Sequence, residues 1–205
     1  MNLGCPGRYT DPGAAARLAS SPPPRRALFL DRDGVINVDR GYVHRPDQVA
    51  FVDGIFDLCA AARDSGWLTI VATNQAGIGR GLYTESQFLE FTGWMHGEFE
   101  RRGVPLSATY YCPHHPVSGR GPYLLDCPCR KPAPGMLQRA IADFAIDAAG
   151  SWLVGDKAGD IRAGRAAGVG TCLLLGPDPL PGEGGEKIGD LADALRRWVP
   201  AQGSA

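Results

Sequence analysis

The sequence predicts an α/β fold with three layers, in which helices cover both faces of a central parallel β-sheet. Two observations predict it. Short apolar runs, typical of strands buried on both faces, alternate along the chain with segments of helical periodicity. Polar residues follow directly after most of these runs. Because the carboxyl ends of parallel strands share one edge of a sheet, these polar residues are expected to meet in one site.

The composition is that of a globular protein with one sizeable core, since 44% of the 205 residues are hydrophobic. With 21 Lys and Arg against 22 Asp and Glu, the formal charge is −1, so no broad basic field is available for nucleic acid. No apolar run is long enough to span a membrane, and no signal-peptide pattern opens the chain. We therefore expect a cytoplasmic monomer with reduced cysteines and without nucleic-acid or membrane partners.

The domain is expected to occupy residues 27–200. Residues 1–26 are rich in Gly, Ala and Ser and contain three consecutive prolines, which predicts a flexible leader outside the fold. Residues 201–205 are expected to form a short tail.

Strands are predicted wherever a short apolar run is followed by a turn or by polar residues. The first run precedes two acids and a glycine, and the second is almost continuously apolar over seven residues. The later runs are separated from one another by helical segments, which favours parallel pairing. The predicted strands are residues 27–30, 67–73, 106–111, 152–154 and 171–175.

Helices are predicted from apolar spacings of three and four residues between start and stop signals. Gly66 ends the first helix, Thr84 and Gln87 form a capping box that opens the second, and Pro134 suits the first turn of the third. The predicted helices are residues 54–63, 84–102, 134–144, 157–167 and 188–199. Residues 77–81 lack the Gly-Lys-Ser/Thr ending of a nucleotide P-loop, so we reject that function for them.

Two carboxylates, Asp31 and Asp33, follow the first strand, and Gly34 lets the backbone turn away. Alternation along an extended backbone sends both acids to the same side, where they can reach one metal ion or one substrate atom. Paired acids of this kind suit a hard cation and a phosphoryl group. A solvated turn is the structural alternative, because Asp and Gly are common turn residues.

Other strand ends supply further polar groups, among them Thr73 and Asn74 after the second strand and Asp156 after the fourth. Lys131 is the natural cationic partner for a phosphate at this edge. Three carboxylates with oxygen-rich neighbours favour Mg²⁺, which usually bridges to a substrate phosphate.

Together these residues resemble the haloacid dehalogenase superfamily of phosphotransferases. Its four motifs are matched in order by residues 31–33, Thr73, Lys131 and residues 155–160. The sequence departs at Val35, where relatives often have Thr, and we expect this difference to affect local packing rather than chemistry.

The resemblance implies a role for each matched residue. Asp31 is expected to be the nucleophile that forms an aspartyl-phosphate, and Asp33 the general acid and then the general base. The Asp31 carboxylate, the Asp33 backbone carbonyl and Asp156 are the implied Mg²⁺ ligands. Thr73 and Lys131 are expected to hold the transferring phosphoryl oxygens.

The same resemblance implies a Rossmann-like sheet without a large cap domain. It also implies that Asp160 orients its neighbours rather than binding the metal directly.

A second group of residues is typical of a zinc site. Cys112, His114, Cys127 and Cys129 offer three thiolates and one imidazole, a closed tetrahedral set for Zn²⁺, although the spacing is not the usual zinc-finger one. His115 is a competing imidazole that spacing does not exclude. Reduced surface cysteines are the alternative interpretation.

A closed set leaves no open position, so we expect a structural zinc that clamps residues 112–129 and delivers Arg130 and Lys131 to the site. Of the other cysteines, Cys5 is expected in the leader, and Cys59 and Cys172 in the core.

The zinc-bearing loop narrows the resemblance to the D-glycero-D-manno-heptose 1,7-bisphosphate 7-phosphatase family, carried by residues 29–44, 73–81, 111–115 and 127–136. This resemblance, which covers roughly residues 27–176, implies hydrolysis of the C7 phosphate in the ADP-heptose pathway of lipopolysaccharide core synthesis.

The resemblance also suggests which residues face the sugar. Arg130 is expected to contact the distal phosphate or the sugar, and Asn74 and Gln75 to hydrogen-bond sugar hydroxyls. His44 and Arg45 either close over the substrate or lie on an exposed loop without a role.

Three alternatives stay open. Histidinol-phosphate phosphatases have a similar fold, acids and zinc loop, but their substrate carries an amine and one phosphate, and residues 77–81 offer Arg80 rather than acids. A polynucleotide 3′-phosphatase would need a basic DNA-binding face. A catalytically silent phosphate-binding module is the alternative from a different class.

Overall fold

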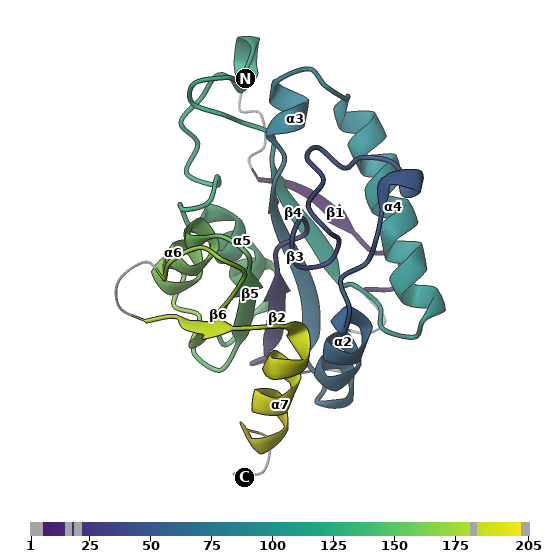
Figure 1. The fold of residues 1–205 in the computed structure, drawn as a ribbon, viewed down its shortest axis with the longest axis vertical. Helices are drawn as coiled ribbons and strands as arrows, with labels where there is room; N and C mark the ends of the chain where they lie inside the picture. Colours follow the sequence, from purple (N-terminus) through teal and green to yellow (C-terminus); the bar gives the residue numbers. More distant parts are fainter. Residues whose placement is uncertain (1–5, 15–17, 19–21, 181–183, 202–205) are drawn as a thin grey trace.

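The computed structural model describes residues 6–14, 18, 22–180 and 184–201. Its centre is a seven-stranded sheet with the order β1-β4-β3-β2-β5-β6-β7 (Figure 1). All neighbouring strands run parallel except β1 and β4, which are antiparallel. The strands are β1 Gly7–Thr10, β2 Ala27–Leu30, β3 Leu68–Asn74, β4 Ala108–Cys112, β5 Trp152–Gly155, β6 Thr171–Leu175 and β7 Glu186–Ile188.

Helices cover both faces of the sheet, which confirms the predicted three-layer α/β fold (Figure 1). Helices α2, α4 and α7 pack on one face, and α5 and α6 on the other. The helices are α2 Ile55–Asp64, α3 Ala76–Gly79, α4 Glu85–Arg101, α5 Gly135–Phe144, α6 Ala158–Ala166 and α7 Leu191–Ala201, with short 3₁₀ turns at Pro46–Gln48 and Gly121–Tyr123.

The core consists of two apolar layers separated by the sheet. Strand β2 contributes to both, because Leu28 and Leu30 face the α2, α4 and α7 side while Ala27 and Phe29 face α5 and α6. All four side chains of β2 are buried, as expected for a central parallel strand. Strand β2 therefore has no freedom to shift, and the residues that follow it are held firmly in place.

Part of the segment expected to be a flexible leader belongs to the sheet. Gly7–Thr10 forms β1, which pairs antiparallel with β4 in the register Gly7 to Tyr111. The composition of residues 1–26 suggested disorder, but four residues are enough for an edge strand once a neighbouring strand supplies its hydrogen bonds. Of the leader predicted over residues 1–26, residues 1–5, 15–17 and 19–21 lie outside the described residues, as do residues 202–205 of the tail predicted over 201–205. Ala201, predicted to belong to the tail, ends helix α7.

Two smaller differences concern element boundaries. Ile188, predicted to begin the last helix, ends strand β7, and the helix starts at Leu191. Residues 76–79 form the short helix α3, in a segment for which no helix was predicted. None of the helices in the described part of the chain has the length and apolar character needed to cross a bilayer.

Candidate active site

The candidate site lies at the carboxyl edge of β2, β3 and β5. Strand β2 is flanked by β3 on one side and β5 on the other, so the chain changes direction across the sheet at this point, where α/β folds bind ligands. Asp31 follows β2, Thr73 lies near the end of β3, and Asp156 follows β5. A cleft of about 540 Å³ opens here, lined among others by Asp31, Asp33 and Thr73.

Lys131 lies at the centre of the site, buried between two carboxylates. Its Nζ is 2.8 Å from Asp31 Oδ1 and 2.6 Å from Asp160 Oδ1, and it donates a hydrogen bond of 2.6 Å to the carbonyl of Ala72. Burial alone would lower the pKa of Lys131, but the carboxylates of Asp160 and Asp31 outweigh it and raise this pKa. The ammonium is therefore charged in the cleft, 2.8 Å from the predicted nucleophile.

The Asp31 carboxyl is nearly enclosed. Burial raises its pKa, and the charge of Lys131 only partly opposes this effect. The backbone amide of Asp31 is bonded to the carbonyl of Val154 at 3.0 Å, which ties the end of β2 to β5.

Asn74 holds the segment that carries Lys131. Its Oδ1 accepts a hydrogen bond of 3.0 Å from the Lys131 amide, and its Nδ2 donates one of 3.0 Å to the Lys131 carbonyl. The side chain was expected to bond sugar hydroxyls, whereas in the structure both ends of its amide are bonded to protein groups. Asn74 thus joins β3 to a residue 57 positions further along the chain.

Gln75 also bonds to protein groups rather than standing free for a sugar. Its Nε2 donates to Thr73 Oγ1 at 2.8 Å and to Asp33 Oδ2 at 3.3 Å, while its Oε1 accepts from Tyr83 at 2.7 Å. Asp33 accepts a further hydrogen bond of 3.1 Å from Asn37. Gln75 therefore links Thr73, predicted to hold a phosphoryl oxygen, to Asp33, the predicted general acid and base.

Three carboxylates gather where a cation site was predicted. Asp31, Asp156 and Asp160 each offer an oxygen, and these atoms all lie within 4.8 Å of one another. Asp156 Oδ1 is buried and has no hydrogen-bond partner among the described residues. Burial, together with the charge of Asp31, raises the pKa of Asp156 to about 7. A buried oxygen of this kind, among other carboxylates, fits a hard cation such as Mg²⁺.

Asp160 is less available to a cation than the other two acids. One of its oxygens is paired with Lys131, and the other accepts a hydrogen bond of 3.0 Å from the Lys157 amide at the start of α6. This arrangement fits the predicted orienting role of Asp160.

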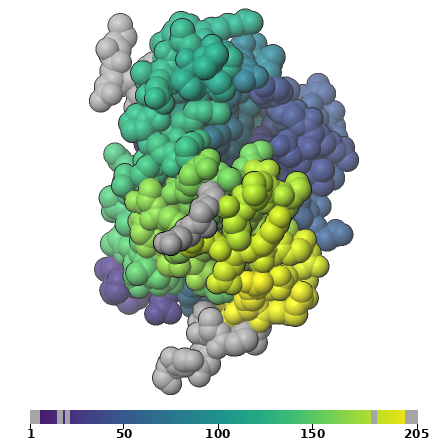
Figure 2. Space-filling model, turned by 60° about the vertical axis from the view of Figure 1, so that its left-hand side comes forward, coloured from purple at the N-terminus to yellow at the C-terminus, as the bar shows by residue number. Residues whose placement is uncertain are grey.

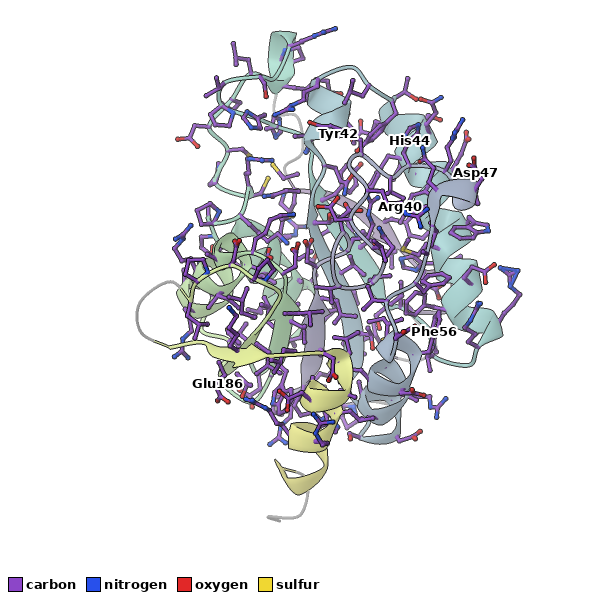
Figure 3. All side chains as sticks on the ribbon, viewed as in Figure 1. Arg40, Tyr42, His44, Asp47, Phe56 and Glu186 are labelled. Carbon is purple, nitrogen blue, oxygen red and sulfur yellow. The ribbon has the colours of Figure 1, made fainter. Side chains whose placement is uncertain are left out.

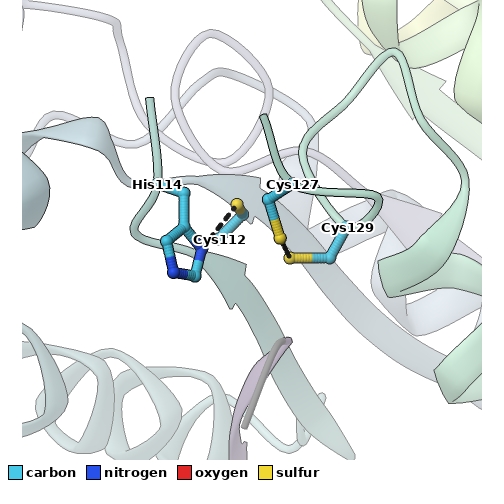
Figure 4. Close-up of side chains that lie close together, drawn as sticks. All are labelled: Cys112, His114, Cys127 and Cys129. Atoms are coloured by element: carbon cyan, nitrogen blue, oxygen red, sulfur yellow. Dashed lines mark hydrogen bonds between the residues drawn. The ribbon is translucent and has the colours of Figure 1, made fainter. Parts of the chain in front are cut away.

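The predicted zinc ligands also lie together (Figure 4). Ligand atoms of Cys112, His114, Cys127 and Cys129 are all within 4.8 Å of one another, and all four residues are buried. Cys112 and Cys127 are thiols, whereas Cys129 is disulfide-bonded, so the expectation of reduced cysteines is wrong for this residue. Burial lowers the pKa of His114, which favours the neutral imidazole that binds metals. His115 lies elsewhere, lining the cleft, so the structure brings His114 and not His115 into the cluster.

Residues 112–129 form an excursion that begins at the end of β4, and Figure 2 shows this part of the chain in teal at the top of the molecule. Arg130 Nη1 donates a hydrogen bond of 3.1 Å to the carbonyl of His114, so the excursion is tied to the cleft wall. Cys59 and Cys172 are buried in the core, as expected, and Cys5 lies outside the described residues.

A loop of residues 38–45, called the Tyr42 loop below, forms another wall of the cleft (Figure 3). Tyr42 contacts Arg80, and Asp39 Oδ2 is 3.2 Å from Lys157 Nζ. Asp39, Tyr42 and Lys157 were missed at the sequence level, because a loop without periodicity carries no signal for its partners.

His44 and Arg45, for which both closure over the substrate and an exposed loop without a role were left open, do not line the cleft. The His44 ring stacks on Tyr83 with centroids 4.6 Å apart, and Arg45 is exposed next to Asp47. The His44 stacking holds the end of the Tyr42 loop against the segment that precedes α4.

Comparisons with known proteins agree with this geometry. A HAD-hydrolase-like family model matches residues 128–177. A D-glycero-alpha-D-manno-heptose-1,7-bisphosphate 7-phosphatase from Burkholderia mallei is 54% identical over 150 residues, which are 73% of this chain and 79% of the relative. A D-glycero-beta-D-manno-heptose-1,7-bisphosphate 7-phosphatase from Yersinia pestis is 46% identical over 174 residues, 84% of this chain and 88% of the relative.

Solved structures resemble the fold over most of its length. A HAD-like phosphatase from Mesorhizobium loti superposes with a TM-score of 0.79 at 35% identity, covering 87% of this chain and 86% of that one. A D,D-heptose 1,7-bisphosphate phosphatase from B. bronchiseptica, solved with magnesium and phosphate, gives 0.75 at 31% identity, covering 86% and 99%. The chain therefore belongs to the D-glycero-D-manno-heptose-1,7-bisphosphate 7-phosphatase family of haloacid dehalogenase-like hydrolases, and it is a phosphatase.

Proposed function

We propose that this phosphatase removes the C7 phosphate of D-glycero-D-manno-heptose 1,7-bisphosphate, in the cytoplasm, as a step of ADP-heptose synthesis for the lipopolysaccharide core. The observation that carries the substrate class is the pair of arginines, Arg80 and Arg130, that line the same cleft as Asp31 and Lys131. A substrate with a second anionic group gives both arginines a partner, because guanidinium groups recognise phosphates through paired hydrogen bonds.

In the first step, Asp31 Oδ attacks phosphorus, and the bond between phosphorus and the sugar oxygen breaks. The leaving oxygen takes a proton from Asp33, which produces the free sugar hydroxyl and an aspartyl-phosphate. In the second step, Asp33 takes a proton from water as the water oxygen attacks phosphorus, and inorganic phosphate leaves while Asp31 is regenerated. Lys131 and Thr73 hold phosphoryl oxygens, and Lys131 is already 2.8 Å from Asp31.

Two metal ions are proposed. Asp31, the backbone carbonyl of Asp33 and Asp156 would hold Mg²⁺, which when bound neutralises phosphate charge during attack by a carboxylate. The orphaned oxygen of Asp156 supports this assignment.

The cluster of Cys112, His114, Cys127 and Cys129 would hold a structural Zn²⁺ when the Cys129 disulfide is reduced, because zinc binds cysteine as the thiolate. Its buried, closed ligand set supports a clamping role for the excursion, whose end carries Arg130 and Lys131.

Histidinol phosphate fits the cleft less well. Its amine would need an acidic partner, but the acids that line the cleft already have cationic partners or belong to the catalytic group. Asp39 is paired with Lys157, and Asp31 and Asp160 are paired with Lys131.

The test is a comparison of turnover on both C1 anomers of the heptose bisphosphate with turnover on histidinol phosphate. Both anomers are needed because the relatives' names include both. We expect kcat/KM for one heptose anomer to exceed that for histidinol phosphate by at least about a hundredfold, since a missing anionic partner leaves the half-buried arginines Arg80 and Arg130 unpaired.

Asp31→Asn is expected to abolish phosphate release, while Asp47→Asn, on an exposed carboxylate outside the cleft, serves as the matched control. Preferential turnover of histidinol phosphate would overturn the substrate assignment. Near-normal turnover by Asp31→Asn would remove Asp31 as the nucleophile, and no turnover of any substrate by the wild type would favour a silent phosphate-binding module.

A further inference from the structure

We propose that Arg32, the residue between the two acids, is a positioning residue that holds the Asp33 carboxylate in place and couples it to the Tyr42 loop. The inference rests on the proposed acid-base role of Asp33. Sequence patterns gave Arg32 no role, because alternation along the strand directs it away from the side that Asp31 and Asp33 share.

Arg32 makes the charged contact to Asp33. Its Nη2 is 2.6 Å and its Nε 3.1 Å from Asp33 Oδ2. Asn37 donates to the other oxygen at 3.1 Å, and Gln75 donates to Oδ2 at 3.3 Å. The Asp33 carboxylate thus accepts four hydrogen bonds from three side chains. Arg32 donates the two shorter bonds to Oδ2, and it is the charged donor among the three.

Arg32 itself has little freedom to move. The residue is 2% exposed, and its guanidinium lies over the rings of Phe91, at 5.3 Å from the centroid, and Phe88, at 5.8 Å. Both rings belong to α4, whose core side is buried. The guanidinium is therefore an anchor built into the helix layer rather than a mobile surface group.

Stability alone is a weak explanation for a guanidinium at this position. Taking the charge out of water is costly, and a buried ion pair often stabilises a fold no better than apolar side chains of similar volume. Nη1 of Arg32 is buried and has no hydrogen-bond partner among the described residues, so this guanidinium does not use all of its donors. This arrangement is expected where the position of the partner carboxylate matters.

One nitrogen also joins Asp33 to the loop that lines the cleft. Arg32 Nη2, which contacts Asp33, donates a hydrogen bond of 2.7 Å to the carbonyl of Val43. The neighbouring Tyr42 lines the cleft and has a φ of 55°, a strained value for a residue other than glycine. A substrate that contacts this part of the loop is therefore connected, through the Val43 carbonyl, to the guanidinium that orients Asp33.

The decisive experiment is a double-mutant cycle between Arg32→Gln and Asp33→Asn, read out as kcat and KM on the heptose bisphosphate. We expect Arg32→Gln to lower kcat about ten- to a hundredfold, less than the roughly 10²- to 10⁴-fold that acid-base catalysis contributes because Asp33 itself is retained, and to leave KM nearly unchanged. In the Asp33→Asn background the same change is expected to have an effect of less than about twofold, because a residue that acts through Asp33 has nothing left to position.

Arg32→Lys keeps the charge between the two rings but lacks the fork that reaches both Asp33 and Val43, so an intermediate kcat is expected. It also serves if Arg32→Gln folds poorly. Arg102→Gln is the matched control, since Arg102 also lies over two phenylalanines, Phe51 and Phe56, and pairs with a carboxylate, Glu98, outside the cleft. Its kcat is expected to equal that of the wild type.

Two results would overturn the inference: an unchanged kcat in Arg32→Gln, or an equal fold-loss with and without Asp33. These differ from a failure of the proposed function. If Asp33→Asn alone keeps normal turnover, the acid-base role of Asp33 is wrong whatever Arg32 does.

Discussion

Among single residues, Gly34 combines a steric constraint in the site with a backbone conformation that favours glycine. Its φ is 93°, and a Cβ atom at this position would lie 2.3 Å from Asp156 Oδ2. The backbone that leaves β2 and the carboxylate that leaves β5 are therefore packed so closely that only hydrogen fits between them. The glycine predicted as a simple turn residue is, in the structure, also a spacer for a proposed metal ligand.

Gly34→Ala is expected to displace Asp156 and to lower kcat about a hundredfold, since misplacement of a catalytic group by about 1 Å costs this much. The Mg²⁺ concentration needed for half-maximal activity should rise as well. Steady-state kinetics over a Mg²⁺ titration measures both effects.

Gly66→Ala is the matched control for this change. Gly66 has a φ of 73°, but nothing lies within 4 Å of a Cβ placed there. Alanine is expected to cost about 1–2 kcal/mol of stability from backbone strain alone, with unchanged kcat. Equal losses of activity in both variants would contradict the steric explanation for Gly34.

At the scale of elements, Asp143 connects helix α5 to strands β1 and β4 at one edge of the sheet. It accepts a hydrogen bond of 2.7 Å from Tyr110 of β4, and it pairs with Arg8 of β1 at 2.7 Å and with Arg139 of α5 at 2.8 Å. Burial alone would raise the pKa of Asp143, but the hydrogen bond from Tyr110 and the charges of Arg139 and Arg8 outweigh it and lower this pKa. Strand β1, which composition did not predict, is thus attached to α5 partly through the ion pair between Arg8 and Asp143.

Asp143→Asn is expected to destabilise the protein by about 1–2 kcal/mol at pH 6, mostly through the Tyr110 contact, because the two arginines are largely exposed and screened. Since the pKa of Asp143 is lower in the folded than in the unfolded chain, the carboxylate stabilises the fold above about pH 4 and less as the pH falls through the folded pKa. The gap between wild type and variant should therefore narrow towards pH 3.

Urea unfolding at both pH values measures this gap. Asp64→Asn, on an exposed carboxylate at the end of α2, provides the comparison and should show a much smaller gap. A gap for Asp143→Asn that is constant between pH 6 and pH 3 would show that charge plays no part.

At the scale of the whole molecule, the site is assembled from segments that are distant in the chain. Lys131 joins Asp31 and Asp160 across the carboxyl edge, and its backbone is held by Asn74. The excursion of residues 112–129 ends at Arg130 and Lys131, so its folding determines where both cations lie. The proposed zinc would therefore act on catalysis from outside the cleft.

Metal analysis is expected to find about one zinc ion per chain in the wild type and in His115→Ala, but little in His114→Ala. The two variants are matched neighbours, and only His114 belongs to the ligand cluster. His114→Ala should lose activity and become sensitive to proteolysis within the excursion, while the sheet stays folded. A zinc-free, fully folded and active protein would contradict the clamp.

Much of this architecture was readable in the chain itself. The order of strands and helices follows from apolar runs and caps, which depend on near neighbours in the sequence. The acids at the ends of β2 and β5 could be placed together because parallel strands share one edge. The cysteines and His114 were marked by residue type and spacing.

The sequence by itself thus determined the α/β class, the order of the main strands and helices, and most of the residues proposed for the site. Only the tertiary structure decided that β1 joins the sheet, that His114 rather than His115 faces the cysteines, and that Asn74 and Gln75 bond to protein groups. It alone revealed that Arg32 donates hydrogen bonds to the Asp33 carboxylate. The physical reason is range: periodicity and caps are local, whereas hydrogen-bond partners and steric limits between distant segments exist only once the chain has packed.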